Sequence, residues 1–431
     1  MLPESWTPLR YHPVQAKLWA SRSRFRAVVA GRGSGKTELA RRYITRMLRV
    51  NKNLDGSRKT WNDPLYFYAM PTYAQAKRVV WRKLLSLIPK EWIDGRPNLS
   101  EMCIRTVFGS TLYVLGMDRP ERAEGVQWDG GIVDESSDQK PGVFDLTLMP
   151  ALSHRTGWCW RIGVPKRYGI GASEFREFYD QGVRGEGVES FTWTSEDILT
   201  PEQLAWAKMH TDAQDYSEQY LANFENAGGL VFHAFSDANI EHREYDPSKP
   251  LIVCSDFNIN PMSWCFAQEH ENNVYIIDEL FMRNCNTQLA LDALAMRYAG
   301  RHMSDWEFFG DAAGRARDTS ATETDYLQIR NDDRFKPKRV YYPKANPSRR
   351  DRYASCNAML CSAAGVRRVF ISPKCTRLIA DCRSRAYVPG TFDTNDTGDM
   401  GHMSDAMGYF IHRRYPMRLN TASIPGKVLI R

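Results

Sequence analysis

The feature that most constrains the fold of this chain is a glycine-rich segment near its start. Residues 30–37 read AGRGSGKT, a β-prone run at residues 26–30 leads into them, and residues 38–48 follow with apolar side chains at helical spacing. A strand, a glycine loop and a helix in this order are the setting in which such a loop holds the phosphates of a nucleotide. The alternative is an ordinary glycine turn ahead of a helix. The length and setting of the motif favour the phosphate-binding loop.

Each residue type in this loop has a physical task. The glycines let backbone N–H groups close around phosphate oxygens at a helix N-terminus. Lys36 supplies a positive charge to the β- and γ-phosphates, and the Thr37 hydroxyl ligates Mg²⁺. Ala30 stands where glycine is usual, a small replacement that keeps the loop possible. We therefore expect ATP and Mg²⁺ to be bound by the loop residues, which are Gly31, Arg32, Gly33, Ser34, Gly35, Lys36 and Thr37.

Two acids at the end of a second apolar run predict the hydrolytic part of the same site. Residues 130–135 read GGIVDE, so a small apolar strand would end at Asp134 and Glu135. Asp134 would hold Mg²⁺ through water, and Glu135 would polarise the attacking water as a general base. Such pairs are common at strand ends, but behind a phosphate loop the pair favours hydrolysis over small-molecule kinase chemistry. The pattern predicts a P-loop NTPase domain of the ASCE type.

Two further candidates have weaker support. Gln15 precedes the loop and could read the adenine edge by hydrogen bonds, or it could simply belong to the start of an amphipathic helix. Arg119 and Arg122 precede the second acidic strand. An arginine there could reach the γ-phosphate of ATP on a neighbouring subunit, an interaction worth about 10³–10⁵ in rate where it operates. A loop arginine is more often merely solvated, so Arg122 is a minority hypothesis.

The second half of the chain carries acids on a different pattern. Asp256 lies in a buried-strand run, Asp311 ends a later strand, and His402 and Asp405 lie at the start of a last helix, with Ser404 expected as its N-cap. Strands interrupted by a helix, with acids in this order, resemble the ribonuclease H-like fold. The pattern predicts strands over residues 250–257, 263–268, 274–277 and 306–310, and helices over residues 287–298, 352–364, 376–385 and 405–411.

These acids would suit a two-metal nuclease. Cleavage of a phosphodiester by two metals needs hard oxygen ligands that hold ions about 3.5–4 Å apart. Asp256 would bridge two Mg²⁺ or Mn²⁺ ions, Asp311 and Asp405 would each complete a coordination shell, and His402 would ligate or assist proton transfer. Any single aspartate is more often a turn or cap residue, so the prediction depends on the joint pattern.

Composition limits the remaining possibilities. The chain has 431 residues, which predicts two or three domains, and its net charge of +7 permits a polyanionic partner without requiring one. The nine cysteines form no Cys-x-x-Cys pair, which favours reduced, buried thiols over disulfides or a zinc site. No signal peptide and no apolar run of about 18 residues is present, so we expect a cytoplasmic protein.

With these residues in view, the chain resembles the large terminase subunit of tailed bacteriophages over nearly its whole length. Val164 stands where the coupling motif of that family usually has threonine, and residues 394–399 lack the lysine that often precedes the nuclease histidine. Asp256, Asp311, His402 and Asp405 match the nuclease positions. The other matching segments are residues 30–37 (ATP loop), 69–77 (second motif), 132–135 (acidic strand), 163–165 (coupling motif) and 217–232 (hinge).

The resemblance implies a viral DNA-packaging motor. ATP hydrolysis would drive translocation of double-stranded DNA into a procapsid, and the nuclease would cut concatemeric DNA at the start and end of packaging. The implied partners are viral DNA, the portal protein of the procapsid, a small terminase subunit and further copies of the chain in a ring expected to be a pentamer. The implied location is the host cytoplasm, with transient binding to the procapsid, no membrane, and absence from the mature virion.

The same resemblance gives the domain boundaries that we expect. The ATPase motor domain would take residues 1–195, a linker or lid residues 196–245, and the nuclease domain residues 246–418. A tail over residues 419–431 could dock on the portal or be a frayed basic terminus. One rival is a DNA helicase-nuclease of repair, which would need a second motor-like domain where a nuclease pattern stands. The other is an assembly subunit with an inert nuclease, against which the intact set of acids argues.

Overall fold

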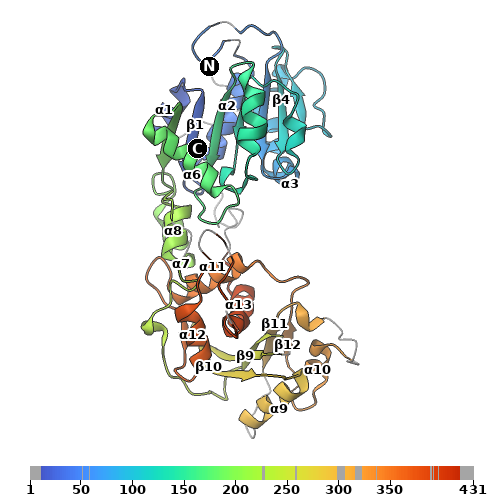
Figure 1. The fold of residues 1–431 in the computed structure, drawn as a ribbon, viewed down its shortest axis with the longest axis vertical. Coiled ribbons are helices and arrows are strands. Elements are labelled where there is room, and N and C mark those ends of the chain that lie inside the picture. Colours follow the sequence, from blue (N-terminus) through green and yellow to red (C-terminus); the bar gives the residue numbers. More distant parts are fainter. Residues whose placement is uncertain are drawn as a thin grey trace. The chain divides into compact units, whose positions relative to one another are not determined.

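The computed structural model describes two compact units. Its described residues are 11–50, 52–57, 59–225, 229–257, 260–298, 306–315, 323–335, 337–388, 391, 393–396 and 398–417. Within them, the N-terminal unit takes residues 11–204 and 217–225, and the C-terminal unit takes residues 205–216 and 229–417 (Figure 1). The expected linker over residues 196–245 is thus shared between the units, and the expected domain boundaries stay a prediction. The tail over residues 419–431 lies outside the described residues.

A mostly parallel sheet forms the centre of the N-terminal unit (Figure 1). Seven described strands follow the order β3-β4-β2-β5-β6-β1-β7, and every neighbouring pair is parallel except β3 and β4. Because β1, β6 and β5 are neighbouring parallel strands, the loop after β1 and the acids after β5 lie at the same edge of the sheet. The strands are β1 (Phe25–Ala30), β2 (Leu65–Met70), β3 (Cys103–Arg105), β4 (Thr111–Gly116), β5 (Gly130–Val133), β6 (Trp158–Gly163) and β7 (Val188–Trp193).

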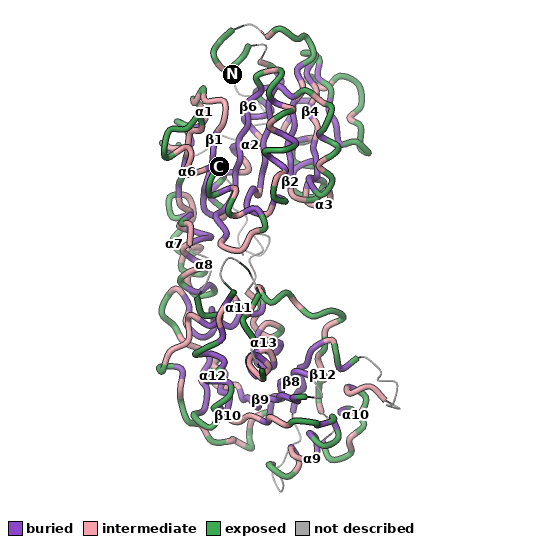
Figure 2. The backbone as a smooth tube through the Cα atoms, viewed as in Figure 1, coloured by how far each residue is buried: buried purple, intermediate pink, exposed green. Residues whose placement is uncertain are grey.

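Both faces of this sheet are buried, which explains why its strands are nearly continuous apolar runs. Along β2, Tyr66 and Tyr68 pack in one apolar cluster and Phe67 in another on the opposite face. Figure 2 shows the strands buried and the outer surfaces of the helices exposed. The helices of this unit are α1 (Pro13–Ala20), α2 (Lys36–Met47), α3 (Tyr73–Gln75), α4 (Arg82–Leu87), α5 (Met149–Ser153) and α6 (Ala172–Arg184), while α7 (Pro201–His210) and α8 (Ala213–Gln219) each contain a boundary between the units.

The C-terminal unit contains a mixed sheet with the order β12-β11-β8-β9-β10-β13 among its described strands. Three consecutive strands, β8, β9 and β10, form an antiparallel meander. In the same sheet, β11 is parallel to β8, β12 to β11 and β13 to β10. The strands are β8 (Ile252–Asp256), β9 (Met262–His270), β10 (Asn273–Met282), β11 (Glu307–Gly310), β12 (Arg339–Tyr341) and β13 (Val369–Ile371).

Helices cover the two faces of this second sheet. On one face, Leu291 of α9 and Tyr326 of α10 share an apolar cluster with Val253 of β8 and Phe308 of β11. On the other face, α13 packs against β8, β9 and β11 and is flanked by α11 and α12 (Figure 1). The helices are α9 (Thr287–Arg297), α10 (Asp325–Asn331), α11 (Arg349–Leu360), α12 (Thr376–Ser384) and α13 (His402–Arg414).

The predicted N-cap of α13 is wrong. The residue before the helix is Gly401, with a φ of 100°, and Ser404 is buried inside the first turn. Asp381 of α12 accepts hydrogen bonds from the backbone N–H groups of Gly401 (3.0 Å) and Ser404 (2.9 Å). A carboxylate from a neighbouring helix therefore caps α13, and a serine hydroxyl within its own segment is not needed. The helix begins at His402 as a result.

Two further expectations concern the whole chain. All nine cysteines lie in the described residues and are free, eight of them buried, as predicted for reduced thiols. None of the helices described here combines the length and the apolar character that a membrane crossing requires.

Candidate functional site

The glycine loop lies between the end of β1 and the start of α2, as the sequence predicts. Gly33 and Gly35 have φ values of 73° and 84°, in the left-handed region that favours glycine. A Cβ at Gly31 would collide with the Ser195 hydroxyl, so this position also needs glycine. The loop therefore has the backbone shape that brings successive N–H groups to the N-terminus of α2, where an anion binds favourably.

Side chains from distant segments hold the loop in this shape. Gln15 Nε2 and Trp193 Nε1 each donate to the Ser34 carbonyl at 3.0 Å. The Ser195 hydroxyl donates to the Arg32 carbonyl at 2.7 Å, and the Arg32 guanidinium donates to Gln219 Oε1 at 3.0 Å. The amide nitrogen of Gln15 is thus bound to the loop backbone, and its role in reading adenine stays a prediction.

Lys36 is a buried cation that faces the predicted catalytic acids. Its side chain is 8% exposed, and its Nζ donates to the Gly31 carbonyl at 3.4 Å. Burial lowers the pKa of Lys36, and the nearby charges of Glu135 and Asp134 oppose that shift. The structure therefore brings the lysine of the loop and the two acids after β5 to one place, as predicted for an ATP site.

The two acids differ in environment. Tyr68 donates to Asp134 Oδ2 at 2.7 Å, and burial together with the charge of Glu135 raises the pKa of Asp134. Burial also acts to raise the pKa of Glu135, but the charges of Lys166, Lys36 and Arg32 outweigh it and lower that pKa. Glu135 has a φ of 50°, which a non-glycine residue adopts only under constraint. Its surroundings thus favour the charged form of Glu135, which suits a general base.

Lys166 is a residue of this site that the sequence analysis missed. It follows directly after residues 163–165, the segment that resembles the coupling motif. Its ammonium pairs with Glu135 Oε2 at 3.3 Å and with Asp138. The Ser137 hydroxyl donates to the Val164 carbonyl at 2.7 Å, so the two turns are joined twice. The position next to a recognised motif is the only signal in the sequence.

The loop arginine candidate lies apart from these contacts. Arg122 is in a short 3₁₀ turn (Pro120–Ala123), and its guanidinium carbon lies 5.9 Å from the centre of the Tyr73 ring. A contact with ATP of a neighbouring subunit involves a second copy of the chain, so this role stays a prediction.

In the C-terminal unit, three of the four predicted nuclease residues meet on one face of the sheet. Asp256 ends β8 and Asp311 follows the adjacent parallel strand β11, so both leave the same edge. Val253 and Phe308 lie on the face covered by α9 and α10. Side chains alternate along a strand, so Asp256 and Asp311, each three residues further on, lie on the opposite face, which α13 covers. His402, in the first turn of α13, hydrogen-bonds through Nδ1 to Asp256 Oδ2 at 2.9 Å.

The electrostatics of this group fit a cation. Asp311 is 5% exposed, and its Oδ1 is buried with no hydrogen-bond partner among the described residues. Burial and the charge of Asp256 raise the pKa of Asp311 to about 6. The hydrogen bond with Asp256 raises the pKa of His402. An unsatisfied carboxylate oxygen beside a second carboxylate is what a divalent cation would neutralise.

Asp405 has a different partner here. Its Oδ1 lies 2.8 Å from Arg385 Nη1 and 3.4 Å from Arg352 Nη1. Across the residues that the structure describes, no group of three or more histidine, cysteine, aspartate or glutamate side chains is arranged to hold a metal ion. The pair of Asp256 and Asp311 fits one cation, and the two-ion site that includes Asp405 stays a prediction.

Tyr409 is the second residue that the sequence analysis missed. It lies one turn after Asp405 on α13, and Arg352 lies over its ring at 4.3 Å. Burial raises the pKa of Tyr409, Arg352 opposes this shift, and the charges of Asp256, Asp405 and Asp311 add to it. The tyrosine therefore lies among all three predicted acids. Its spacing from Asp405 was the available signal.

In sequence, the chain is similar to large terminase subunits of phages. No family model matches the chain. The large terminase subunits of Thermus virus P23-45 and Thermus phage G20c are each 25% identical to it over 295 residues, which cover 58% of this chain and 58% of the relative. The chain thus aligns with little more than half the length of these relatives.

In fold, the chain is similar to a large terminase of known structure, from a thermophilic bacteriophage. One crystal form of that protein has a TM-score of 0.63 at 14% identity, covering 94% of this chain and 99% of that one. The same terminase in complex with ATP-gamma-S has a TM-score of 0.60 at 15% identity with the same coverage. The predicted fold class is confirmed: a P-loop domain of the ASCE type precedes a ribonuclease H-like domain.

Proposed function

We propose, from the premise that this chain is a relative of the large terminase subunits of tailed bacteriophages, that it is the ATP-driven motor and the nuclease of a viral DNA-packaging machine. The observation that carries the proposal is the presence of two separate sites on one chain. In one, Lys36 faces Asp134 and Glu135. In the other, Asp256, Asp311 and His402 meet on a ribonuclease H-like sheet.

In the ATP site, the residues of this chain bind phosphate and activate water. The loop N–H groups and Lys36 would hold the β- and γ-phosphates, and Thr37 and Asp134 would hold Mg²⁺, which neutralises charge on the phosphates when bound. Glu135, whose pKa is lowered, would accept a proton from the attacking water. The thermophilic phage terminase in complex with ATP-gamma-S, similar in fold, supports the choice of nucleotide.

In the nuclease site, Asp256 and Asp311 would hold Mg²⁺ or Mn²⁺. The metal supplies Lewis acidity and a nucleophilic water when bound. At pH values below about 6, Asp311 would have to release its proton for the cation to bind, so binding should weaken there. His402 is oriented by Asp256 and would exchange a proton with water or with the leaving oxygen. If Asp405 is to complete the set, it must leave Arg385.

The partners and location that the resemblance implies belong to the same proposal. They are double-stranded viral DNA, the portal protein of a procapsid, a small terminase subunit and a ring of copies of this chain, in the host cytoplasm and transiently on the procapsid. The net charge of +7 supports a polyanionic partner.

Paired variants test the two sites separately. Lys36→Ala should abolish ATP hydrolysis and leave plasmid cleavage with Mn²⁺ intact, whereas Asp256→Asn should abolish cleavage and leave hydrolysis intact. Lys17→Ala, an exposed lysine of α1, is the matched control for the first variant, and Glu271→Gln, in an exposed turn, for the second. Undiminished ATP hydrolysis in Lys36→Ala would refute the proposed ATP site and with it the proposed motor function. Unchanged cleavage in Asp256→Asn would favour an assembly subunit with an inert nuclease.

A further inference from the structure

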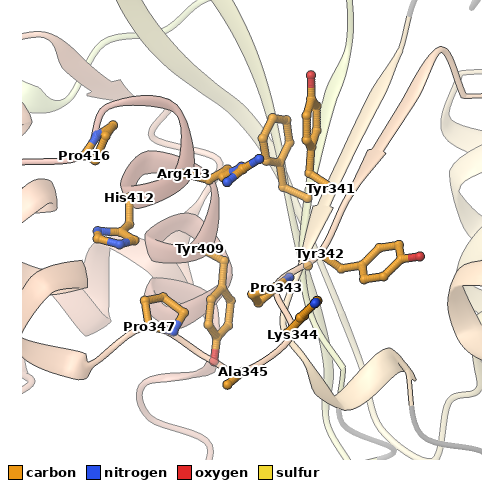
Figure 3. Close-up of a pocket in the computed structure, with 12 residues that line it drawn as sticks. Tyr341, Tyr342, Pro343, Lys344, Ala345, Pro347, Tyr409, His412, Arg413 and Pro416 are labelled. Atoms are coloured by element: carbon orange, nitrogen blue, oxygen red, sulfur yellow. The ribbon is translucent and has the colours of Figure 1, made fainter.

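A pocket of about 420 Å³ lies next to the candidate nuclease residues (Figure 3). The end of β12 and the segment after it form one wall, with Tyr341, Tyr342 and Lys344, and the second half of α13 forms the facing wall, with Tyr409 and Arg413. A volume of this size is in the range of pockets that bind small organic groups, about 300–1,000 Å³. None of the predicted site residues lines it, so the sequence analysis did not assign it any role.

The pocket and the nuclease site share a wall. Gly310 lines the pocket, and the next residue is Asp311. Tyr409 also lines the pocket, and the charges of Asp256 and Asp311 act on its hydroxyl. A group in the pocket would therefore lie beside the position where the phosphodiester to be cut must bind.

Much of the lining is aromatic and rigid. Phe309 and Tyr341 stack with ring centres 4.6 Å apart and planes at 20°. Tyr342 stacks on Tyr326 at 4.3 Å. Arg413 lies 5.8 Å from the centre of the Tyr341 ring. Aromatic faces beside a guanidinium are the surface on which unpaired nucleic acid bases stack.

The charge of the lining is positive. Its charged residues are Lys344 and Arg413, and it contains no aspartate or glutamate. In the described part of the chain, neither Lys344 nor Arg413 forms an ion pair with a carboxylate. These cations lie next to an acidic cluster that would repel phosphates, so they offer the nearest compensation for a DNA backbone.

We propose that this pocket binds one nucleotide of an unpaired DNA strand, with the base on the Tyr341 wall and its phosphate at Lys344 and Arg413. The inference rests on the proposed nuclease, because it states how the strand next to the cut is held. A base inside a duplex has both faces covered by neighbouring bases, so only an unpaired or flipped base can use an aromatic wall. The substrate of the cutting step is then locally opened DNA.

Binding without metal tests the pocket separately from cleavage. The full chain in EDTA is titrated with a fluorescent single-stranded oligonucleotide, with the same oligonucleotide lacking bases at central positions, and with a duplex of equal length. Tyr341→Leu should weaken binding of the intact single strand about 10-fold, and of the abasic strand and duplex less than about 2-fold. Tyr341→Phe keeps the ring face and should bind like the wild type.

A second pair of variants tests the phosphate contact and does not depend on an aromatic replacement. Lys344→Gln and Arg413→Gln change exposed side chains and should each reduce the salt dependence of single-strand binding by about 0.7 in log–log slope. Lys374→Gln, exposed in the same unit and outside the pocket lining, is the matched control.

The outcomes separate this inference from the proposed function. Equal losses for intact, abasic and duplex DNA in Tyr341→Leu would overturn base recognition, and so would unchanged binding in Tyr341→Leu. Unchanged salt slopes in both glutamine variants would overturn the phosphate contact. If Asp256→Asn loses cleavage but Tyr341→Leu does not change the preference for the intact single strand over the abasic strand, the proposed nuclease is supported and the pocket inference is refuted.

Discussion

Lys166 joins the two turns of the ATP site that the sequence marks separately. Its pairing with Glu135 and Asp138 neutralises acids that would otherwise repel each other and the phosphates. The Glu135 backbone is in the left-handed region, with a φ of 50°, where a non-glycine residue is strained. A cation directly after the segment that resembles the coupling motif is thus bound to the residue proposed to activate water, so a shift of that segment would also shift Glu135.

The first prediction concerns this ion pair. Replacing Lys166 by glutamine removes the charge that lowers the pKa of Glu135, so that pKa should rise. Because the base must be ionised, the acidic limb of the ATPase pH–rate profile should move to higher pH, with the rate at pH 7 reduced about 10-fold. Steady-state hydrolysis from pH 5 to 9 measures this. Lys140→Gln, an exposed lysine two residues after Asp138, should leave the limb in place; an unmoved limb in Lys166→Gln would contradict the role.

The second prediction follows from the raised pKa of Asp311. Its value of about 6 exceeds the ~3.9 of an unfolded aspartate, so the folded chain binds this proton more tightly. The free energy of unfolding of the metal-free protein should therefore fall by about 2 kcal/mol as pH rises from about 4 to 6. Asp311→Asn should remove this fall and be more stable than the wild type at pH 8. Urea unfolding in EDTA at several pH values measures the free energy of unfolding of both proteins. If it changes with pH in the same way in both, the predicted contribution of Asp311 is contradicted.

Single residues of the sites could be predicted where their type and their place in an element are both diagnostic. Lys36 and Glu135 follow from a loop and a strand end, and Asp256 and Asp311 from the ends of two strands that prove to be adjacent. The pairing of Asp405 could not be predicted in this way. Its arginine partners come from α11 and from the residue after α12, and nothing local in the sequence relates those segments to α13.

At the scale of elements, the existence of helix α13 follows from its sequence pattern, whereas its ends do not. The apolar spacing predicted a helix over residues 405–411, and the observed helix is longer at both ends, from His402 to Arg414. The predicted serine cap failed because Asp381 on α12 supplies the acceptor. Helices and strands were predictable because burial repeats along each segment, whereas a cap supplied by another element depends on tertiary packing.

The third prediction concerns the arginine that anchors the start of α13. Arg385 is 1% exposed and donates to Asp396 and to Asp405, each at 2.8 Å. Replacing it by methionine leaves two carboxylates without their buried partner, which should lower the free energy of unfolding by about 3–5 kcal/mol. Arg383→Met, two residues earlier in the last turn of α12 but about half exposed and paired with an exposed aspartate, should cost less than about 1 kcal/mol. Urea denaturation measures the free energy of unfolding of both variants. Similar decreases in the two would contradict a larger contribution from the buried ion pairs.

For the whole molecule, the division into two units could be expected from length and from two unrelated motif sets. The path of the chain between them could not. Residues 205–216 belong to the C-terminal unit, and residues 217–225 return to the N-terminal unit, where Gln219 binds Arg32 of the glycine loop. These short helices carry no core of their own, so their sequence does not say which unit buries them. The hinge that the resemblance places at residues 217–232 stays a prediction.

The last prediction belongs to the complete chain on DNA. A motor that must pass any sequence is expected to contact mainly phosphates, and phosphate contacts release counterions when they form. Affinity for duplex DNA should therefore fall at least about 10-fold between 50 and 200 mM salt, and cleavage with Mn²⁺ should show little sequence preference. Fluorescence titrations across salt and end-sequencing of the cleavage products measure the two effects. Because the aromatic pocket binds a base by stacking, its contribution should be the part of single-strand binding that persists at high salt. A sharply defined cleavage sequence without a partner protein would contradict readout through phosphates.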